Sequence, residues 1–489
     1  MKRTALLLGG IGAGIGFVFA ACSLDLDESL IAGSDAGSDV STGGASGSGG
    51  AAGSGGSGGT GGKIVDSGPA CDADPQCTID GGCIEGRCAS NTCVYEICPV
   101  ENSCEARSCD TATGVCSAPQ SYGFKATSID LDSDVGCSGQ ASRCVAGMDD
   151  YVFVGTDAGI LAWRVLSPAN PEPITVQQPA FGVAINRVVA TEKAVVFIGP
   201  LSSGKLSVAW VNLPADPLAT QLPIQTAQVS LSDSYSYAYP GGESSFFLVL
   251  NDPNAPFPAA HLDLPLTNNQ DVTLYPASGL GTGNNVVAAS GSTLVFYRTD
   301  TTTAQVPTFS LETSAGTSNA QFNGEQADAA LTVPTSLSAH NFTSAYDGSV
   351  LWSTNNLVAA DGGGLEADAV MLRWPITGTS TTVDTSIEVK VEEGYTPTGQ
   401  NAALAGPSAL IDGSTAIVTA AYPADTSQTR VRSVTRSGST LTVGSKASVL
   451  TFPISQIGVS ASRRFGFVLT PSSQNPTLKA ALHVFAPGC

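Results

Sequence analysis

The chain has 489 residues, with 42 acidic against 21 basic side chains and a formal net charge of −21 at pH 7. Nucleic-acid binding depends on basic patches that neutralise phosphates, so this charge argues against a nucleic-acid partner. The sequence contains only 3 His, which leaves little imidazole for a metal centre or a nucleophile–base pair.

The first residues have the pattern of an export signal. A basic head, Met1-Lys2-Arg3, precedes an uncharged apolar run from Ala5 to Ala21. This pattern predicts a signal peptide over residues 1–21, with an uncleaved anchor or a plain secretory signal as alternatives. Ala20-Ala21-Cys22 resembles the bacterial lipoprotein box. The resemblance implies cleavage before Cys22, lipid on its thiol and attachment to a membrane.

Residues 22–69 are predicted to be the lipidated Cys followed by a disordered linker. From Asp35 to Gly62 the segment is almost wholly Gly, Ser, Ala, Thr and Asp, so almost no apolar side chain is present to bury. A coil of this length spans about 30 Å and would lift a folded domain off a membrane. Ser23 implies, within the lipoprotein resemblance, delivery to the outer membrane. We therefore expect a bacterial cell-envelope location, at the outer membrane or cell surface.

Cysteines are concentrated in residues 70–119. The sequence has 13 Cys, and setting Cys22 aside leaves an even number, as a disulfide framework requires. Their density predicts an extracytoplasmic module held by disulfides. A zinc site is the rival interpretation, but no Cys-x-x-Cys pair occurs and no His precedes His261. The disulfide candidates in this module are Cys71, Cys77, Cys83, Cys88, Cys93, Cys98, Cys104, Cys109 and Cys116.

The module contains an odd number of cysteines, so at least one must pair outside it. The available partners are Cys137, Cys144 and Cys489. The simplest scheme pairs Cys137 with Cys144 and joins Cys489 to the module, although sequence alone leaves the connectivity open.

One segment of the module has a recognisable pattern. Residues 102–116 resemble the Cys-x4-Cys-Asp-x-x-Thr-Gly-x-Cys repeats of secreted myxobacterial proteins, with Cys104, Cys109, Asp110 and Cys116 at the matching positions. The resemblance implies a secreted or surface protein and names no activity.

Residues 120–489 are predicted to form many short strands, because β-branched and aromatic runs alternate with Gly, Asp, Asn and Pro. A strand–turn–strand pattern recurs seven times at intervals of about 50 residues, and a further strand follows each copy. The anchor residues of the seven copies are Phe153, Phe197, Phe247, Phe296, Trp352, Val418 and Phe467.

Seven such units predict a mainly β fold, a seven-bladed β-propeller preceded by the disulfide-rich module and the disordered Gly/Ser stalk. A pair of β-sandwiches is the alternative, although it does not predict this repeat. Residues 347–355, with Trp352-Ser353-Thr354-Asn355, and residues 369–375 resemble blades of secreted bacterial propellers that carry a Tyr-Trp-Thr-Asn motif.

Candidate sites in the main domain are few. Asp130, Asp132 and Asp134 alternate, which would suit calcium, yet Val135 stands where an EF-hand loop needs Gly. As a strand, the same pattern places three carboxylates on one solvated face, and no other cofactor is expected. His261, His340 and His483 are interpreted as ordinary polypeptide positions without a catalytic role.

These features favour a membrane-anchored extracytoplasmic binding or scaffold lipoprotein for an unknown envelope or extracellular ligand, not an enzyme. The alternative is a metal-dependent propeller hydrolase or lyase with carboxylates at the central channel. The residues at the axis distinguish the two: converging Asp, Glu, Asn or His favours the enzyme, whereas apolar or Ser/Thr residues favour the scaffold. The sequence does not indicate the oligomeric state.

Overall fold

The computed structural model consists of β-strands and three short 3-10 helices, with no α-helix in the part of the chain that it describes. This confirms the predicted mainly β class. Between residues 284 and 388 only the backbone is described. The described residues are 62–63, 83–89, 92–98, 100, 104–107, 109–110, 113–177, 185–213, 221–231, 234–240, 243–250, 259–272, 274–275, 284–290, 293–299, 304–305, 308–310, 343–346, 350–358, 365–373, 385–395, 405–411, 414–438, 440–472 and 479–489.

Seven sheets follow one another along the chain, and most neighbouring strands pair antiparallel. The first sheet contains, in pairing order, β16 (Gln221–Leu222), β12 (Glu172–Val176), β11 (Gly159–Arg164), β10 (Tyr151–Thr156) and β9 (Val145–Met148). The second contains β13 (Arg187–Ala190), β14 (Ala194–Ser202), β15 (Lys205–Asn212), β17 (Gln225–Ser230) and β21 (Gln270–Asp271). The third contains β18 (Tyr235–Pro240), β19 (Ser245–Leu250), β20 (Ala259–Asp263) and β22 (Leu274–Tyr275).

The next three sheets repeat the arrangement. The fourth contains β23 (Asn284–Ser290), β24 (Thr293–Thr299), β25 (Ala304–Gln305) and β26 (Thr308–Ser310). The fifth contains β27 (Thr343–Tyr346), β28 (Val350–Val358), β29 (Leu365–Arg373) and β30 (Thr385–Tyr395). The sixth contains β31 (Ala405–Leu410), β32 (Thr415–Tyr422), β33 (Asp425–Ser437) and β34 (Thr440–Leu450).

The seventh sheet joins strands from distant parts of the chain. Its order is β35 (Gly458–Ala461), β36 (Gly466–Thr470), β37 (Ala481–Phe485) and β8 (Lys125–Asp130). β8 precedes the other six sheets, and the repeat pattern did not predict that it pairs with β37. The sequence pattern also suggested that the strand extends through Asp134, whereas β8 ends at Asp130.

The seven predicted anchor residues lie on the second strand of seven different sheets: β10, β14, β19, β24, β28, β32 and β36. Where side chains are described, the anchor phenylalanines are fully buried. Phe153, Phe197, Phe247 and Phe467 are 0% exposed. The rings of Phe153 and Phe197, from the first and second sheets, meet edge to face with centroids 5.8 Å apart, so neighbouring sheets share one core.

We call the strand that precedes each anchor strand the first strand of its sheet. These first strands contact one another in series, and the seventh contacts the first. The contacts run from β9 to β13, β18, β23, β27, β31 and β35, and from β35 back to β9. At this last contact, the Gly147 N–H donates to Ser460 Oγ at 2.7 Å. A Cβ at Gly147 would stand 2.5 Å from the Ala461 carbonyl oxygen, so this contact requires glycine.

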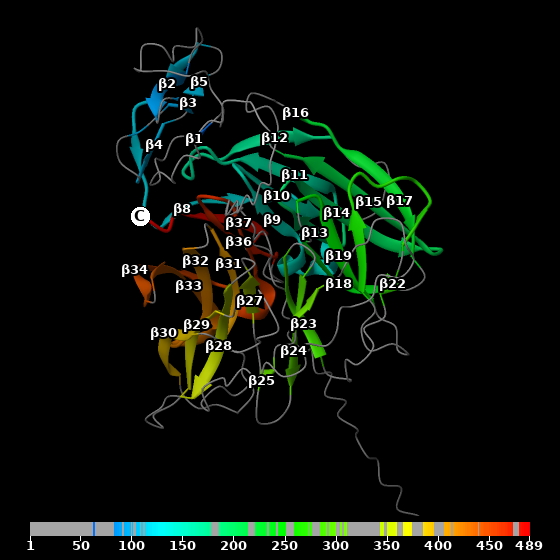
Figure 1. The fold of residues 1–489 in the computed structure, drawn as a ribbon. Coiled ribbons are helices and arrows are strands. Elements are labelled where there is room, and N and C mark those ends of the chain that lie inside the picture. Colours follow the sequence, from blue (N-terminus) through cyan, green and yellow to red (C-terminus); the bar gives the residue numbers. More distant parts are fainter. Residues whose placement is uncertain are drawn as a thin grey trace, which may run out of the picture.

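The Cys-rich module consists of short strands outside the seven sheets, on the side where β8 and β37 lie together (Figure 1). β1 (Gly62–Lys63), β3 (Thr92–Ile97) and β2 (Ile84–Ala89) form one sheet, so the end of the predicted linker contributes a strand. Two smaller pairs are β4 (Glu105–Ala106) with β7 (Gln120–Ser121), and β5 (Cys109–Asp110) with β6 (Val115–Cys116).

The remaining elements are short. The 3-10 helices are η2 (Cys137–Gly139), η3 (Ala141–Arg143) and η4 (Ile454–Gln456). Within the described ranges, no helix has the length and apolar character needed to cross a membrane. The predicted signal peptide, Cys22 and most of the linker lie outside the described residues.

Replacing Gly147 tests the contact between β9 and β35. Gly147→Ala forces two backbones apart and should lower the free energy of unfolding by about 2 kcal/mol. Gly123→Ala is the matched control, because nothing lies within 4 Å of the added Cβ. Urea unfolding of both variants measures the difference, and equal stabilities would refute the close approach.

Candidate functional site

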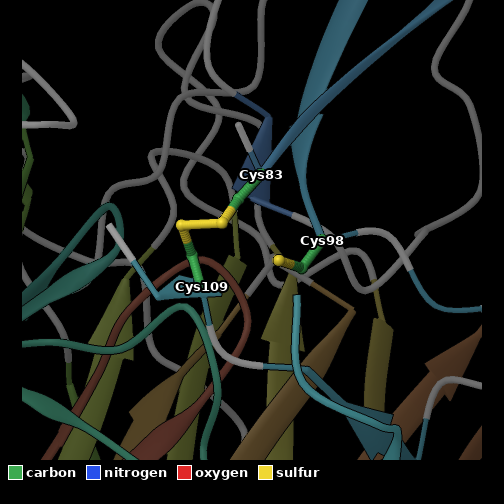
Figure 2. Close-up of side chains that lie close together, drawn as sticks. All are labelled: Cys83, Cys98 and Cys109. Atoms are coloured by element: carbon green, nitrogen blue, oxygen red, sulfur yellow. A yellow bond between two sulfur atoms is a disulfide. The ribbon is translucent and has the colours of Figure 1, made fainter. Parts of the chain in front are cut away.

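Two disulfides of the Cys-rich module lie side by side. Cys83 is bonded to Cys109 and Cys98 to Cys116. The Sγ atoms of Cys83, Cys98 and Cys109 all lie within 4.8 Å of one another. Figure 2 shows the sulfur of Cys98 beside the Cys83–Cys109 bond. We call these four cysteines the sulfur cluster. Leu166 of the main domain packs against it.

Two hairpins position the sulfur cluster. Cys83 and Cys98 flank the β2–β3 hairpin, where the Cys98 N–H donates to the Cys83 carbonyl oxygen at 2.8 Å. Cys109 and Cys116 face each other across the β5–β6 pair. Each hairpin therefore presents two opposed cysteines at its open end, and both disulfides run from one hairpin to the other.

The other described disulfides fasten the main domain. Cys104 is bonded to Cys489, which ties the module to the segment after β37. Cys137 is bonded to Cys144, which encloses η2 and η3. These two bonds correspond to the simplest pairing scheme considered from the sequence, and the predicted use of cysteines in disulfides is confirmed.

The remaining cysteine predictions are only partly described. Cys88 also takes part in a disulfide. Cys93 lies on β3, where its side chain is not described, and Cys71 and Cys77 lie outside the described residues. Their pairing stays a prediction.

Two of the three aspartates considered for calcium, Asp132 and Asp134, contact the segment between β36 and β37. Ser472 Oγ donates to Asp134 Oδ1 at 2.5 Å, and Lys479 Nζ lies 3.9 Å from Asp132 Oδ1. Asp130 is exposed at the end of β8. Among the described residues, the sulfur cluster supplies the only group of three or more Cys, His, Asp or Glu ligand atoms within 4.8 Å of one another. The geometry therefore lends the calcium hypothesis no support.

His483 lies in the seam between β37 and β8. Ser128 Oγ is 2.8 Å from Nδ1, and Thr470 Oγ1 is 3.3 Å from Nε2. Thr470 Oγ1 also donates to the Ala481 carbonyl oxygen at 3.2 Å. This leaves Thr470 to accept from Nε2–H and Ser128 to donate to Nδ1, so a neutral imidazole has both nitrogens paired.

The contact between Ser128 and His483 resembles a nucleophile and its base only in distance. Burial lowers the pKa of His483 to about 3, and the positive charge of Lys125 adds to the effect. Such a ring is a weak base at neutral pH, and its other nitrogen faces a hydroxyl instead of an orienting carboxylate. His483 is therefore a paired residue of the seam, as the sequence interpretation expected.

His261 lies against an aromatic ring and near one carboxylate. His261 stacks on Phe247 with ring centroids 4.5 Å apart, and its Nε2 lies 3.9 Å from Asp263 Oδ1. His340 lies outside the described residues.

A buried charged group joins the fifth and sixth sheets, and the sequence analysis did not identify it. Glu392 on β30 is 5% exposed. It accepts from Arg430 Nη1 at 2.9 Å and from Arg432 Nε at 2.6 Å, both on β33. Arg430 also lies 4.6 Å above the Tyr422 ring. The alternating arginines place both guanidinium groups on one strand face, which is the only signal that the sequence offered.

Two polar side chains lie where β13 and β18 begin. Arg187 opens β13 and is 6% exposed, and it is the only charged residue within the stated bounds of the seven first strands. Tyr235 opens β18 and donates to the Gly199 carbonyl oxygen at 3.1 Å. Burial raises the pKa of Tyr235 to about 12, against the opposing effect of the Arg187 and Arg143 charges and of a hydrogen bond with Asn186.

Comparison with known proteins does not assign a family. No protein-family model and no curated protein matches the chain. The uncharacterized protein lmo1340 from Listeria monocytogenes is 12% identical, with a TM-score of 0.39 over 68% of this chain and 90% of that chain.

Two further solved structures are equally distant. A neuraminidase-like protein of A/flat-faced bat/Peru is 12% identical, with a TM-score of 0.33 over 62% of this chain and 86% of that chain. A Synechocystis apocarotenoid oxygenase variant is 9% identical, with a TM-score of 0.38 over 79% of this chain and 86% of that chain. Likenesses at these scores carry no argument about fold or function.

The Cys104–Cys489 bond should stabilise the chain more than Cys137–Cys144. The two bonds span sequence separations of 385 and 7 residues, so the first removes more unfolded-state entropy. Replacing both members by Ser should cost about 5 kcal/mol for Cys104–Cys489 and about 2 kcal/mol for Cys137–Cys144. Denaturant unfolding without reductant compares the two double variants, and the reverse order would contradict this prediction.

His483 should make the chain acid-sensitive. The folded state holds the pKa at about 3, below the ordinary value of 6.5, so the unfolded state binds the proton first as pH falls. Stability is unaffected above about pH 6.5 and declines from there toward pH 3, by roughly 3 kcal/mol at pH 4. His483→Gln should show a shallower decline in denaturant unfolding at matched pH values. Parallel curves for the two proteins would exclude the effect.

Proposed function

We propose that the chain is an exported lipoprotein, anchored through Cys22, whose residues 120–489 form a seven-bladed β-propeller with a binding or scaffold role in the cell envelope. The serial contact of the first strands, with β35 against β9, supports the propeller. Seven sheets of four or five strands also agree better with blades than with two packed sandwiches.

The disulfides support the extracytoplasmic part of the proposal. The bonds Cys83–Cys109, Cys98–Cys116, Cys104–Cys489 and Cys137–Cys144 belong in an oxidising compartment, because cytoplasmic thiols are kept reduced. The Cys104–Cys489 bond ties the Cys-rich module to the end of the main domain, and the β8–β37 pairing joins distant segments of the main domain. Such fastening suits a protein that works outside the cell, where no chaperone refolds it.

The observation that carries the binding role is the composition of the first strands. Within their stated bounds they contain aliphatic residues and Met, together with Gly, Pro, Ser, Thr, Tyr, Asn and a single Arg, and no Asp, Glu or His. A metal-dependent hydrolase needs carboxylates or imidazoles that converge at the axis. Hydroxyl and amide side chains on these strands would instead offer hydrogen bonds to a polar ligand.

Expression of the full chain in a Gram-negative host tests the anchor. Wild type should incorporate labelled fatty acid, sediment with membranes and expose no alkylatable thiol before reduction. Cys22→Ala should lose the label and appear in the periplasmic extract with its disulfides intact. Free thiols in a cytoplasmic extract would refute the proposal.

The Cys22→Ala protein also tests the binding role. Immobilised on a surface, it should retain a component of isolated envelope polysaccharide or solubilised envelope protein. The same protein, unfolded, reduced and alkylated, is the control, because it lacks the folded surface. Equal retention by both forms would exclude a specific binding surface.

A further inference from the structure

The sulfur cluster has the ligand number and placement of a metal site. We propose that Cys83, Cys98, Cys109 and Cys116, once reduced, bind one zinc ion as four thiolates. The cluster is then a redox-dependent site: two disulfides in an oxidising medium and a tetrathiolate centre in a reducing one. This inference goes beyond the proposed function and does not depend on it.

The distances support one metal ion. Zinc in a tetrathiolate site lies about 2.3 Å from each sulfur, which places the sulfurs about 3.8 Å apart. The Sγ atoms of Cys83, Cys98 and Cys109 already lie within 4.8 Å of one another. The Sγ of Cys116 is bonded to that of Cys98 and lies 3.8 Å from the Cys83 carbonyl oxygen. Reduction must open the Cys83–Cys109 and Cys98–Cys116 pairs from S–S distances of 2.00 Å and 2.04 Å to about 3.8 Å, so each sulfur moves by about 1 Å.

The hairpins explain why the spacing of the sequence does not reveal this site. In common zinc motifs two ligands lie two to four residues apart on one turn. Here the two ligands of each pair come from opposite strands of a hairpin, Cys83 with Cys98 and Cys109 with Cys116. Both pairs are thus held together by strand pairing, and Cys-x-x-Cys is not needed.

The four cysteines differ in burial, and this difference suits both the reduction of the disulfides and the binding of zinc. Cys83 and Cys98 are 4% and 2% exposed, whereas Cys109 and Cys116 are partly exposed. The outer sulfurs are therefore open to a reductant and to an entering ion. The inner sulfurs are shielded from water, which favours soft thiolate ligands for zinc.

The redox chemistry requires a dithiol reductant. Its thiolate attacks Cys109 Sγ, the Cys109–Cys83 bond breaks, and the electron pair leaves on Cys83 Sγ. The second thiol of the reductant closes its own disulfide and releases Cys109 as a thiolate. The same sequence at Cys116 releases Cys98, so two dithiols are oxidised and four cysteine thiols form. Zinc binding then displaces four protons.

Cobalt tests the site, because its tetrathiolate complex is coloured. The Cys22→Ala chain is reduced anaerobically with a dithiol, freed of reductant and titrated with Co²⁺. Thiolate-to-cobalt bands should saturate at one ion per cluster and disappear when Zn²⁺ is added, whereas the oxidised chain should show none. Absence of these bands from the reduced chain would overturn the proposal.

Two double variants test which cysteines give rise to the thiolate-to-cobalt bands. Cys98→Ser with Cys116→Ser should abolish the tetrathiolate spectrum, whereas Cys137→Ser with Cys144→Ser removes an equal number of thiols elsewhere and should keep it. An unchanged spectrum in the first variant would overturn the assignment.

Alkylation of the reduced wild-type sequence gives a result that does not depend on folding of a variant. Zn²⁺ should protect Cys83, Cys98, Cys109 and Cys116 at least tenfold over Cys137 and Cys144, as read by mass spectrometry of the labelled peptides. Protection confined to other cysteines, or equal at all of them, would also overturn the proposal.

Discussion

Antiparallel pairing of β37 with β8 is the constraint on which the rest of the main domain depends. It joins residues as far apart in sequence as Ser128 and His483, which are separated by 355 positions. Forming a contact of such separation costs substantial loop-closure entropy, so it needs reinforcement. The Cys104–Cys489 bond adds a covalent link between the module that precedes β8 and the segment that follows β37.

Two ion pairs also join the seventh sheet to the first. Arg463 lies 3.2 Å from Asp149, and Arg464 pairs with Asp150, which links the β35–β36 turn to the β9–β10 turn. In a chain with a net charge of −21, these pairs place two of the scarce cations opposite an acidic turn. Pairs exposed to solvent each contribute little, so the strand pairing and the disulfide carry most of the stability.

The disulfide module and the main domain are stabilised by different interactions. The module is too small to bury a core, and its described buried cluster consists of Cys83 and Cys98 with Cys109, Cys116 and Leu166 packed against them. The main domain buries aromatic and branched side chains between successive sheets. Covalent bonds therefore hold the module, whereas packing holds the sheets.

The amino-acid sequence by itself determined the β class, the period of the strands and the use of disulfides. These are local properties: alternation and turn residues define a strand pair, and the seven anchors all fall on second strands. Cysteine density in a short segment likewise indicates cross-links without specifying partners.

Only the tertiary structure decided which distant segments meet. Nothing in the spacing of Lys125–Asp130 indicates that it pairs with Ala481–Phe485, that Glu392 bridges Arg430 and Arg432, or that two hairpins bring four sulfurs together. The sequence separation of the residues in each contact follows no repeat. The free energy of each contact depends on burial and on partners that only the folded chain brings together. Local patterns therefore predicted the strands, and long-range packing decided the seam and the sulfur cluster.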